Sequence, residues 1–227
     1  MSSLDIAESK NSQEFVEDWS ADKQTYHVPW GKAMMWLFLV SDTFIFTCFL
    51  VGYLNVRRTT TDPWPYPSEV FALELFGHNL PLILIAIMTF VLITSSGTMA
   101  MAVRYAHFRD KKKVFWFMAI TAFFGATFVG MQVFEWSKLI SEGVRPWGNP
   151  FGAPQFGSIF FMVTGFHGLH VSIGVIYLLI VASKVRRGHY DKKDNYEIVE
   201  ITGLYWHFVD LVWGLYFCVF LSLVIEE

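Results

Sequence analysis

The 227-residue sequence contains little charge. Only 16% of its residues are Asp, Glu, Lys or Arg, whereas an ordinary soluble domain contains about 25%. Charged side chains are therefore too few to cover a globular surface in water. The 54% of hydrophobic residues and the mean hydropathy of +0.40 agree with this. Intrinsic disorder is excluded as well, because disordered chains are poor in aromatic residues and 18% of this chain is aromatic.

Cysteine is also scarce. Cys48 and Cys218 lie in apolar runs without a metal-binding or redox spacing, so neither a zinc site nor a disulfide framework is expected. The net charge of −3 gives no support to nucleic-acid binding. We expect no signal peptide, because the first residues lack a basic segment followed by an apolar core. These exclusions leave an integral membrane protein.

Five apolar stretches have the length that a bilayer requires, about 20 residues for a hydrocarbon core about 30 Å thick. We expect transmembrane helices at 33–54, 80–103, 114–136, 158–182 and 203–225. The predicted fold class is therefore all-α, a polytopic bundle of five transmembrane helices. Residues 1–32 are polar and are predicted to form a cytoplasmic N-terminal tail before a single membrane domain over residues 33–227.

The distribution of Lys and Arg predicts the orientation, because cytoplasmic segments of membrane proteins carry an excess of both residues. With the N-terminus inside, thirteen of the 17 basic residues lie on the cytoplasmic side and four lie on the other side. We therefore expect the N-terminus inside and the C-terminus outside.

Small residues indicate where membrane helices can approach each other closely. The third stretch has Ala122, Ala126 and Gly130 in one row, and the fourth has Gly165 and Gly168. We interpret these positions as helix-packing surfaces. A ligand groove is the alternative interpretation of the same rows.

Ionisable side chains at membrane depth cost roughly 2.5–3.5 kcal/mol each on insertion scales, so each needs an explanation. Those inside the apolar stretches are Asp42, Glu135, His167, His170, His207 and Asp210. Asp42 lies near the middle of its stretch and Glu135 near the outer edge. The two histidines of the fourth stretch are three residues apart, as are His207 and Asp210, so each pair shares one face of a helix.

These residues permit three interpretations. The first is a metal or haem site, since imidazole is the commonest metal ligand, and His170 with His207 would supply two axial ligands to a haem. The second is a proton or ion path through Asp42, the histidines and Asp210. The third is structural: His–Asp and His–Glu pairs act as hydrogen bonds between helices, worth about 0.6–2 kcal/mol each. The residue chemistry favours the structural interpretation, because buried polar groups are usually hydrogen-bonded.

Two strings that contain these residues are distinctive. Residues 165–171 (GFHGLHV) and 205–213 (YWHFVDLVW) closely resemble the signatures of the last two helices of haem–copper oxidase subunit III. Shorter matches to the family follow in the same order at Ser41-Asp42, Ser95-Ser96, Gln132–Glu135 and Glu200. The resemblance covers roughly residues 30–227 and is closest to the short, five-helix bacterial form.

The resemblance implies a non-catalytic subunit of a bacterial respiratory terminal oxidase, in the first place a cytochrome c oxidase, in the cytoplasmic (inner) membrane. It implies no catalytic, cofactor-binding or metal-binding residue in this chain. Haem and copper are then expected in partner subunits, with bound phospholipid as an additional ligand. Subunit I is the expected direct partner, beside subunit II and further subunits or a respiratory supercomplex. The chain would stabilise subunit I and support proton uptake while oxygen is reduced to water.

The chain departs from the family at Asp42, where the family has Glu. We expect the Asp42 carboxyl to be protonated and to donate a hydrogen bond across the bundle. Two alternatives to the oxidase assignment stay open. The equivalent subunit of a quinol oxidase or a nitric oxide reductase has the same fold in another complex. A stand-alone transporter or channel belongs to a different class and predicts activity of the chain alone.

Overall fold

The computed structural model describes residues 29–65, 70, 72–75, 78–81, 83–190 and 196–225, without the side chains of residues 72–81 and 220–225. The elements are helix α3 (Trp30–Thr59), strands β1 (Ala72–Leu75) and β2 (His78–Pro81), and helices α5 (Ile83–His107), α6 (Lys111–Ser141), α7 (Gln155–Arg186) and α8 (Glu197–Ile225). The chain divides into two units, residues 1–41 and 42–227. In the first unit the described part is the start of α3. The predicted tail at 1–32 lies almost wholly outside the described residues.

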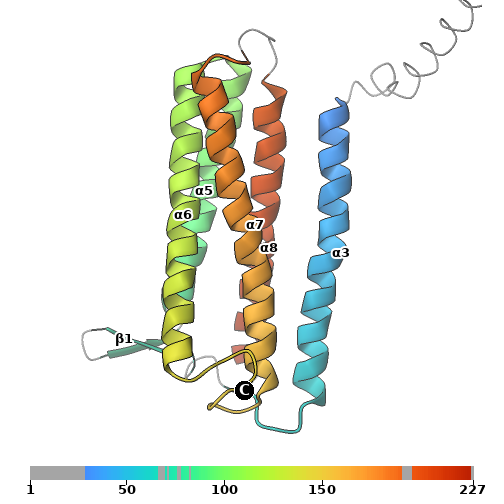
Figure 1. Cartoon of the computed structure of the whole chain (residues 1–227), viewed down its shortest axis with the longest axis vertical. Coiled ribbons are helices and arrows are strands. Elements are labelled where there is room, and N and C mark those ends of the chain that lie inside the picture. The colour runs from blue at the N-terminus through green and yellow to red at the C-terminus, as the bar shows by residue number, and fades with distance from the viewer. Residues whose placement is uncertain are drawn as a thin grey trace, which may run out of the picture. The chain divides into compact units, whose positions relative to one another are not determined.

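Four helices of the second unit are arranged in a ring, in which α5 and α7 each pack against both α6 and α8 (Figure 1). These helices have between 25 and 32 residues, which corresponds to about 38–48 Å at 1.5 Å per residue. They are therefore longer than a hydrocarbon core of about 30 Å. The predicted stretches were too short because polar residues such as Arg104 and Lys138 continue the helices beyond the apolar part.

Among the described residues, α3, α5, α6 and α7 are long and apolar enough to cross a membrane. They coincide with the first four predicted spans. The fifth predicted span, 203–225, coincides with α8, which is helical as expected but is not one of these four. The chain is thus an essentially helical, multi-pass membrane protein.

The segment before α5 contains a feature that the all-α prediction omits. Strands β1 and β2 pair antiparallel, with Ala72 opposite Pro81 and Leu75 opposite His78. The second helix consequently begins at Ile83, whereas the apolar pattern predicted its start at residue 80. Pro81 lacks a backbone N–H, and the end of a two-stranded ladder tolerates this loss better than a helix interior does.

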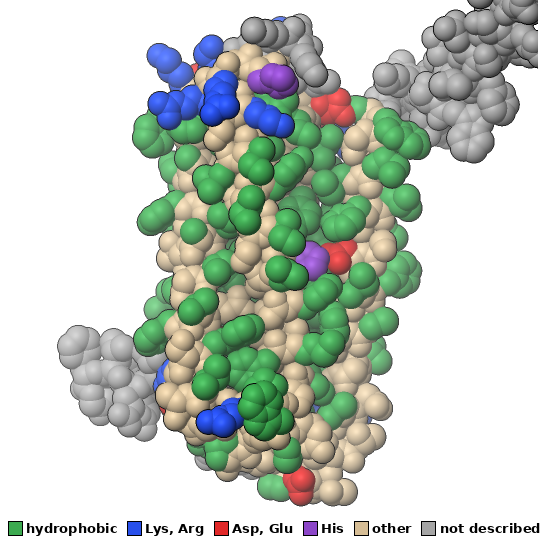
Figure 2. All heavy atoms as spheres, in the orientation of Figure 1, with side chains coloured by type: hydrophobic (Ala, Val, Ile, Leu, Met, Phe, Trp, Pro, Cys, Tyr) green, Lys and Arg blue, Asp and Glu red, His purple; other side chains and the backbone are tan. Residues whose placement is uncertain are grey.

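Apolar side chains cover the outside of the helices. Phe44, Phe90 and Phe123 are 69%, 70% and 68% exposed. In Figure 2, hydrophobic side chains spread along the helices, while Lys and Arg gather at the end where α6 begins and α7 ends. Lys111 and Arg186 belong to these two helix termini. This surface suits contact with lipid or with other membrane subunits.

At Gly125, which the predicted row of small residues did not include, α6 packs tightly against its neighbours. A Cβ atom at Gly125 would collide with the indole ring of Trp206 on α8. Ala122 is buried, but Ala126 and Gly130 are exposed, and a Cβ at Gly130 would meet nothing within 4 Å. Within the described bundle only Ala122 of this row packs against neighbouring helices, and the row as a packing surface stays a prediction. Positions four apart rotate by about 40° around a helix, so the row turns outward.

The two small residues of α7 do lie against another helix. A Cβ atom at Gly165 would be 3.1 Å from the Trp136 ring, and one at Gly168 would be 3.0 Å from Nε2 of Gln132. Both neighbours belong to α6. At these two positions side chains of the adjacent helix fill the space beside the row.

Candidate functional site within the helical bundle

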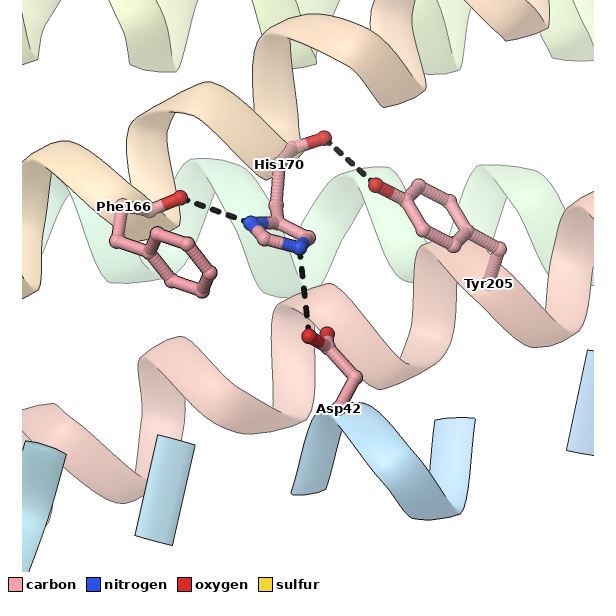
Figure 3. Close-up of polar contacts among 4 residues, drawn as sticks. All are labelled: Asp42, Phe166, His170 and Tyr205. Atoms are coloured by element: carbon pink, nitrogen blue, oxygen red, sulfur yellow. Dashed lines mark hydrogen bonds and ion pairs between the residues drawn. The ribbon is translucent and has the colours of Figure 1, made fainter. Parts of the chain in front are cut away.

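Asp42 of α3 and His170 of α7 form the central polar contact of the bundle. Asp42 is 3% exposed, and its Oδ1 lies 3.5 Å from Nε2 of His170. The other ring nitrogen, Nδ1, lies 2.8 Å from the carbonyl oxygen of Phe166. Tyr205 of α8 donates its hydroxyl to the carbonyl oxygen of His170 at 3.0 Å. Figure 3 shows that these groups come from three helices and meet at the His170 residue.

The donors and acceptors at His170 determine how many protons the pair holds. A carbonyl oxygen can only accept, so Nδ1 carries a hydrogen when it bonds Phe166. Nε2 then either accepts a hydrogen bond from the protonated Asp42 carboxyl or, as N–H of an imidazolium, donates one to the Asp42 carboxylate. In both arrangements one proton lies between the two side chains. The prediction that Asp42 donates across the bundle corresponds to the first arrangement and stays a prediction.

His207 of α8 contacts a different helix. Its Nδ1 lies 2.5 Å from Oγ of Ser96 on α5. Asp210, one turn further along α8, is half-buried and also interacts with the Ser96 hydroxyl. Both ring nitrogens of His170 contact protein groups, as does Nδ1 of His207. Within the described parts of the chain, no three His, Cys, Asp or Glu side chains converge on one point.

His167 points to another side of α7, toward the interior of the ring. It is fully buried, and among the described residues neither ring nitrogen has a hydrogen-bond partner. Its ring stacks on Trp213 with centroids 5.1 Å apart and meets Phe128 edge-on at 5.8 Å. Glu135 of α6 is 5% exposed and lines the same small cavity as His167. The two histidines of one motif thus serve different parts of the bundle.

Glu200 lies near the start of α8. Together with His107, Arg109 and Tyr196 it lines a cavity of about 270 Å³. His107 is the last residue of α5 and Arg109 follows it, so this cavity lies between the ends of two neighbouring helices. The structure therefore separates Glu200 from the buried groups around His167 and His170.

Sequence reasoning missed several further polar contacts between helices, three of which involve an indole or amide donor. Trp206 Nε1 donates to Ser95 Oγ at 3.0 Å, Trp213 Nε1 to Thr89 Oγ1 at 3.1 Å, and Gln132 Nε2 to the Thr164 carbonyl oxygen at 2.6 Å. Two of these donors are indole N–H groups. A buried indole usually finds an acceptor, so the tryptophans of α8 were the available signal, although the sequence does not indicate which hydroxyl accepts.

Comparison with known proteins gives a consistent relationship. Residues 19–224 match the family described as cytochrome c oxidase subunit III. A protein of Staphylococcus aureus (strain USA300) named "Probable quinol oxidase subunit 3" is 31% identical over 192 residues, which cover 85% of this chain and 88% of that protein. A protein of the same name from Staphylococcus saprophyticus is 31% identical over 193 residues, with 85% and 88% covered. The family match contains every polar contact described above, and the chain belongs to the haem–copper oxidase subunit III family.

Proposed function

We propose that the chain is the non-catalytic subunit III of a bacterial respiratory terminal oxidase. It crosses the cytoplasmic membrane with five helices, α8 included, and has its N-terminus inside. It packs against subunit I and leaves haem and copper to partner subunits. The supporting observation is that side chains suited to ligation serve as contacts between helices: His170 meets Asp42 of α3, and His207 meets Ser96 of α5.

The Asp42–His170 pair supports a further part of this proposal, a role in proton uptake by the oxidase. The pair holds one transferable proton among membrane helices, and Asp42 is shielded from solvent. A carbodiimide that partitions into lipid reacts with a protonated carboxyl in apolar surroundings. We expect it to modify Asp42 in the intact complex at neutral pH and to leave the Asp42→Asn variant unmodified at this position. An unmodified Asp42 in wild-type complex would contradict the protonated arrangement.

The electron donor is the finest part of the proposal. The family description names cytochrome c, the donor favoured by the sequence analysis, whereas the staphylococcal relatives are named for quinol. The names of these relatives make a quinol oxidase the second candidate. Each donor is added separately to the purified complex. Oxygen consumption that starts with reduced cytochrome c indicates a cytochrome c oxidase, and consumption that starts with a quinol indicates a quinol oxidase.

Purification of the complex through a tag on this chain tests the assignment itself. We expect haem absorption and oxidase activity to accompany the chain through chromatography in mild detergent. A preparation that keeps the chain and its membrane partners but shows no haem spectrum would overturn the assignment. Ion or solute transport by the chain alone in lipid vesicles would support the transporter alternative instead. Tags at the two termini test the topology: in intact cells only the C-terminal tag should be accessible from outside.

A further inference from the structure

His167 is the buried group that the contacts above do not account for. Its side chain is fully enclosed, and both ring nitrogens lack a hydrogen-bond partner among the described residues. Buried polar groups in proteins almost always have one. Trp213 stacks on one face of the ring, and Phe128 contacts the ring edge-on and also packs against Trp213. The two nitrogens at the ring edge are therefore the groups that still need polar partners.

A cavity of about 30 Å³ adjoins this residue, and we call it the Glu135–His167 cavity. Its lining comes from all four helices of the ring: Ile85, Glu135, Phe160, Val163, Thr164, His167, Trp213, Tyr216 and Phe217. A water molecule requires about 10–15 Å³ of such space and two to four polar partners. The volume is therefore sufficient for water.

The polar groups of the lining supply the partners. Glu135 offers a carboxyl group and His167 one donor and one acceptor. The hydroxyls of Thr164 and Tyr216 already donate to main-chain carbonyl oxygens, at 2.7 and 3.2 Å. The oxygens of these two hydroxyls can still accept. Four polar side chains thus meet at a space whose other walls are apolar.

We propose that the Glu135–His167 cavity is a binding site for water, in which one molecule bridges the Glu135 carboxyl on α6 and the His167 imidazole on α7. The direct His–Glu hydrogen bond expected from the sequence is replaced by a bridged one. The ring of Phe46 packs against both imidazoles, with centroids 6.4 Å from His167 and 5.3 Å from His170. Neither Asp42 nor His170 lines the Glu135–His167 cavity, so the water site is distinct from the Asp42–His170 pair.

X-ray footprinting of the intact complex in lipid nanodiscs tests the site. Radiolysis of a bound water produces a hydroxyl radical in place, which oxidises the aromatic side chains beside it, and mass spectrometry locates the products. Trp213 lines the cavity and Trp206 does not, although both are buried, both belong to α8 and both indoles bond a hydroxyl. We expect oxidation of Trp213 and Tyr216 several-fold above that of Trp206. Trp213 oxidised no more than Trp206 would mean a dry cavity and would overturn the proposal.

Two variants test which groups hold the water. His167→Phe removes the nitrogens but keeps an aromatic ring against Trp213, and Glu135→Leu removes the carboxyl at similar size. Each should bring Trp213 oxidation down to the level of Trp206, while the exposed Trp116 on α6 stays equally oxidised. Undiminished Trp213 oxidation in both variants would contradict bridging by these residues. Haem content measured in the same samples reports whether the oxidase complex is intact. The oxidase assignment is thus tested by the haem content and the water site by the oxidation pattern. If a variant does not assemble, the wild-type comparison still decides whether the cavity holds water.

Discussion

Replacement of Gly125 by alanine is expected to destabilise the bundle, although alanine is the better helix former. The added methyl carbon would lie 2.7 Å from Cγ2 of Val175 on α7 and 3.0 Å from Cζ2 of Trp206 on α8, and closer still to Cη2 of the same ring. The indole has little freedom to move away. It is 1% exposed, and its N–H is bonded to Ser95.

The magnitude follows from two opposing contributions. Insertion of a methyl group into a packed core costs about 1–3 kcal/mol, while Gly→Ala in a helix interior gains about 0.5–1 kcal/mol. We therefore expect a net loss of about 1 kcal/mol for Gly125→Ala, from the difference of these two values. Gly130→Ala is the matched control on the same helix. Its methyl group would meet nothing within 4 Å, so only the gain remains and the variant should be neutral or slightly more stable.

Thermal release of the chain from the purified complex measures this difference. The complex is heated in steps, and the fraction of the chain that stays with the haem-containing subunits is determined after chromatography. A second substitution, Trp206→Phe, removes the part of the indole that collides, so Gly125→Ala should cost less in a Trp206→Phe background than in the wild-type chain. Equal stability of Gly125→Ala and Gly130→Ala would refute the close packing of α6, α7 and α8 at this point.

Substitutions at three further positions test other contacts. Ser95→Ala leaves the Trp206 indole without its acceptor, and we expect thermal release to show a loss of about 1–3 kcal/mol; unchanged release would contradict the hydrogen bond. Asp42→Ala removes the partner of His170 and should cost about 0.6–1.7 kcal/mol of stability. Asp42→Asn keeps a hydrogen-bonding group and should cost less. A larger loss for Asp42→Asn than for Asp42→Ala would argue against the contact. At the start of α6, a hydrogen bond from a nearby lysine lowers the pKa of Asp110 below its ordinary value of 3.8. Its carboxylate therefore stabilises the folded chain above that value, and the contribution is lost as the pH falls through the lowered pKa. Asp110→Asn should be less stable than wild type at pH 7, and a pH series of melting temperatures should show the difference vanishing well below pH 3.8.

Apolar length and composition were sufficient to locate α3, α5, α6 and α7, because a membrane span must be long and uncharged. The ends of the helices were less predictable. α3 runs from Trp30 to Thr59 and thus includes Arg57 and Arg58 in its last turn, where long basic side chains can reach the interface. Hydropathy detects the apolar part of a helix but not its polar ends.

Which helices meet at a polar residue was beyond the sequence. The spacing of His167 and His170 placed both on neighbouring positions of α7, yet one faces Asp42 of α3 and the other a cavity with Glu135 of α6. Two positions three apart differ by about 60° around the helix, which is enough to separate their partners at a junction between helices. The same limit applies to Gly125, whose importance comes from Trp206 on another helix.

The Asp42–His170 contact also has a consequence for biosynthesis. His170 follows Asp42 by 128 residues, and at roughly 5–20 residues per second the ribosome needs roughly 6–25 s to make that length. During this interval the helix with Asp42 has left the ribosome, while the imidazole that will meet it does not yet exist. The Asp42 carboxyl of the first membrane helix therefore gains its partner only after the fourth membrane helix has been synthesised. A slowed ribosome between these two points would prolong the period in which the nascent chain carries an unmatched carboxyl group.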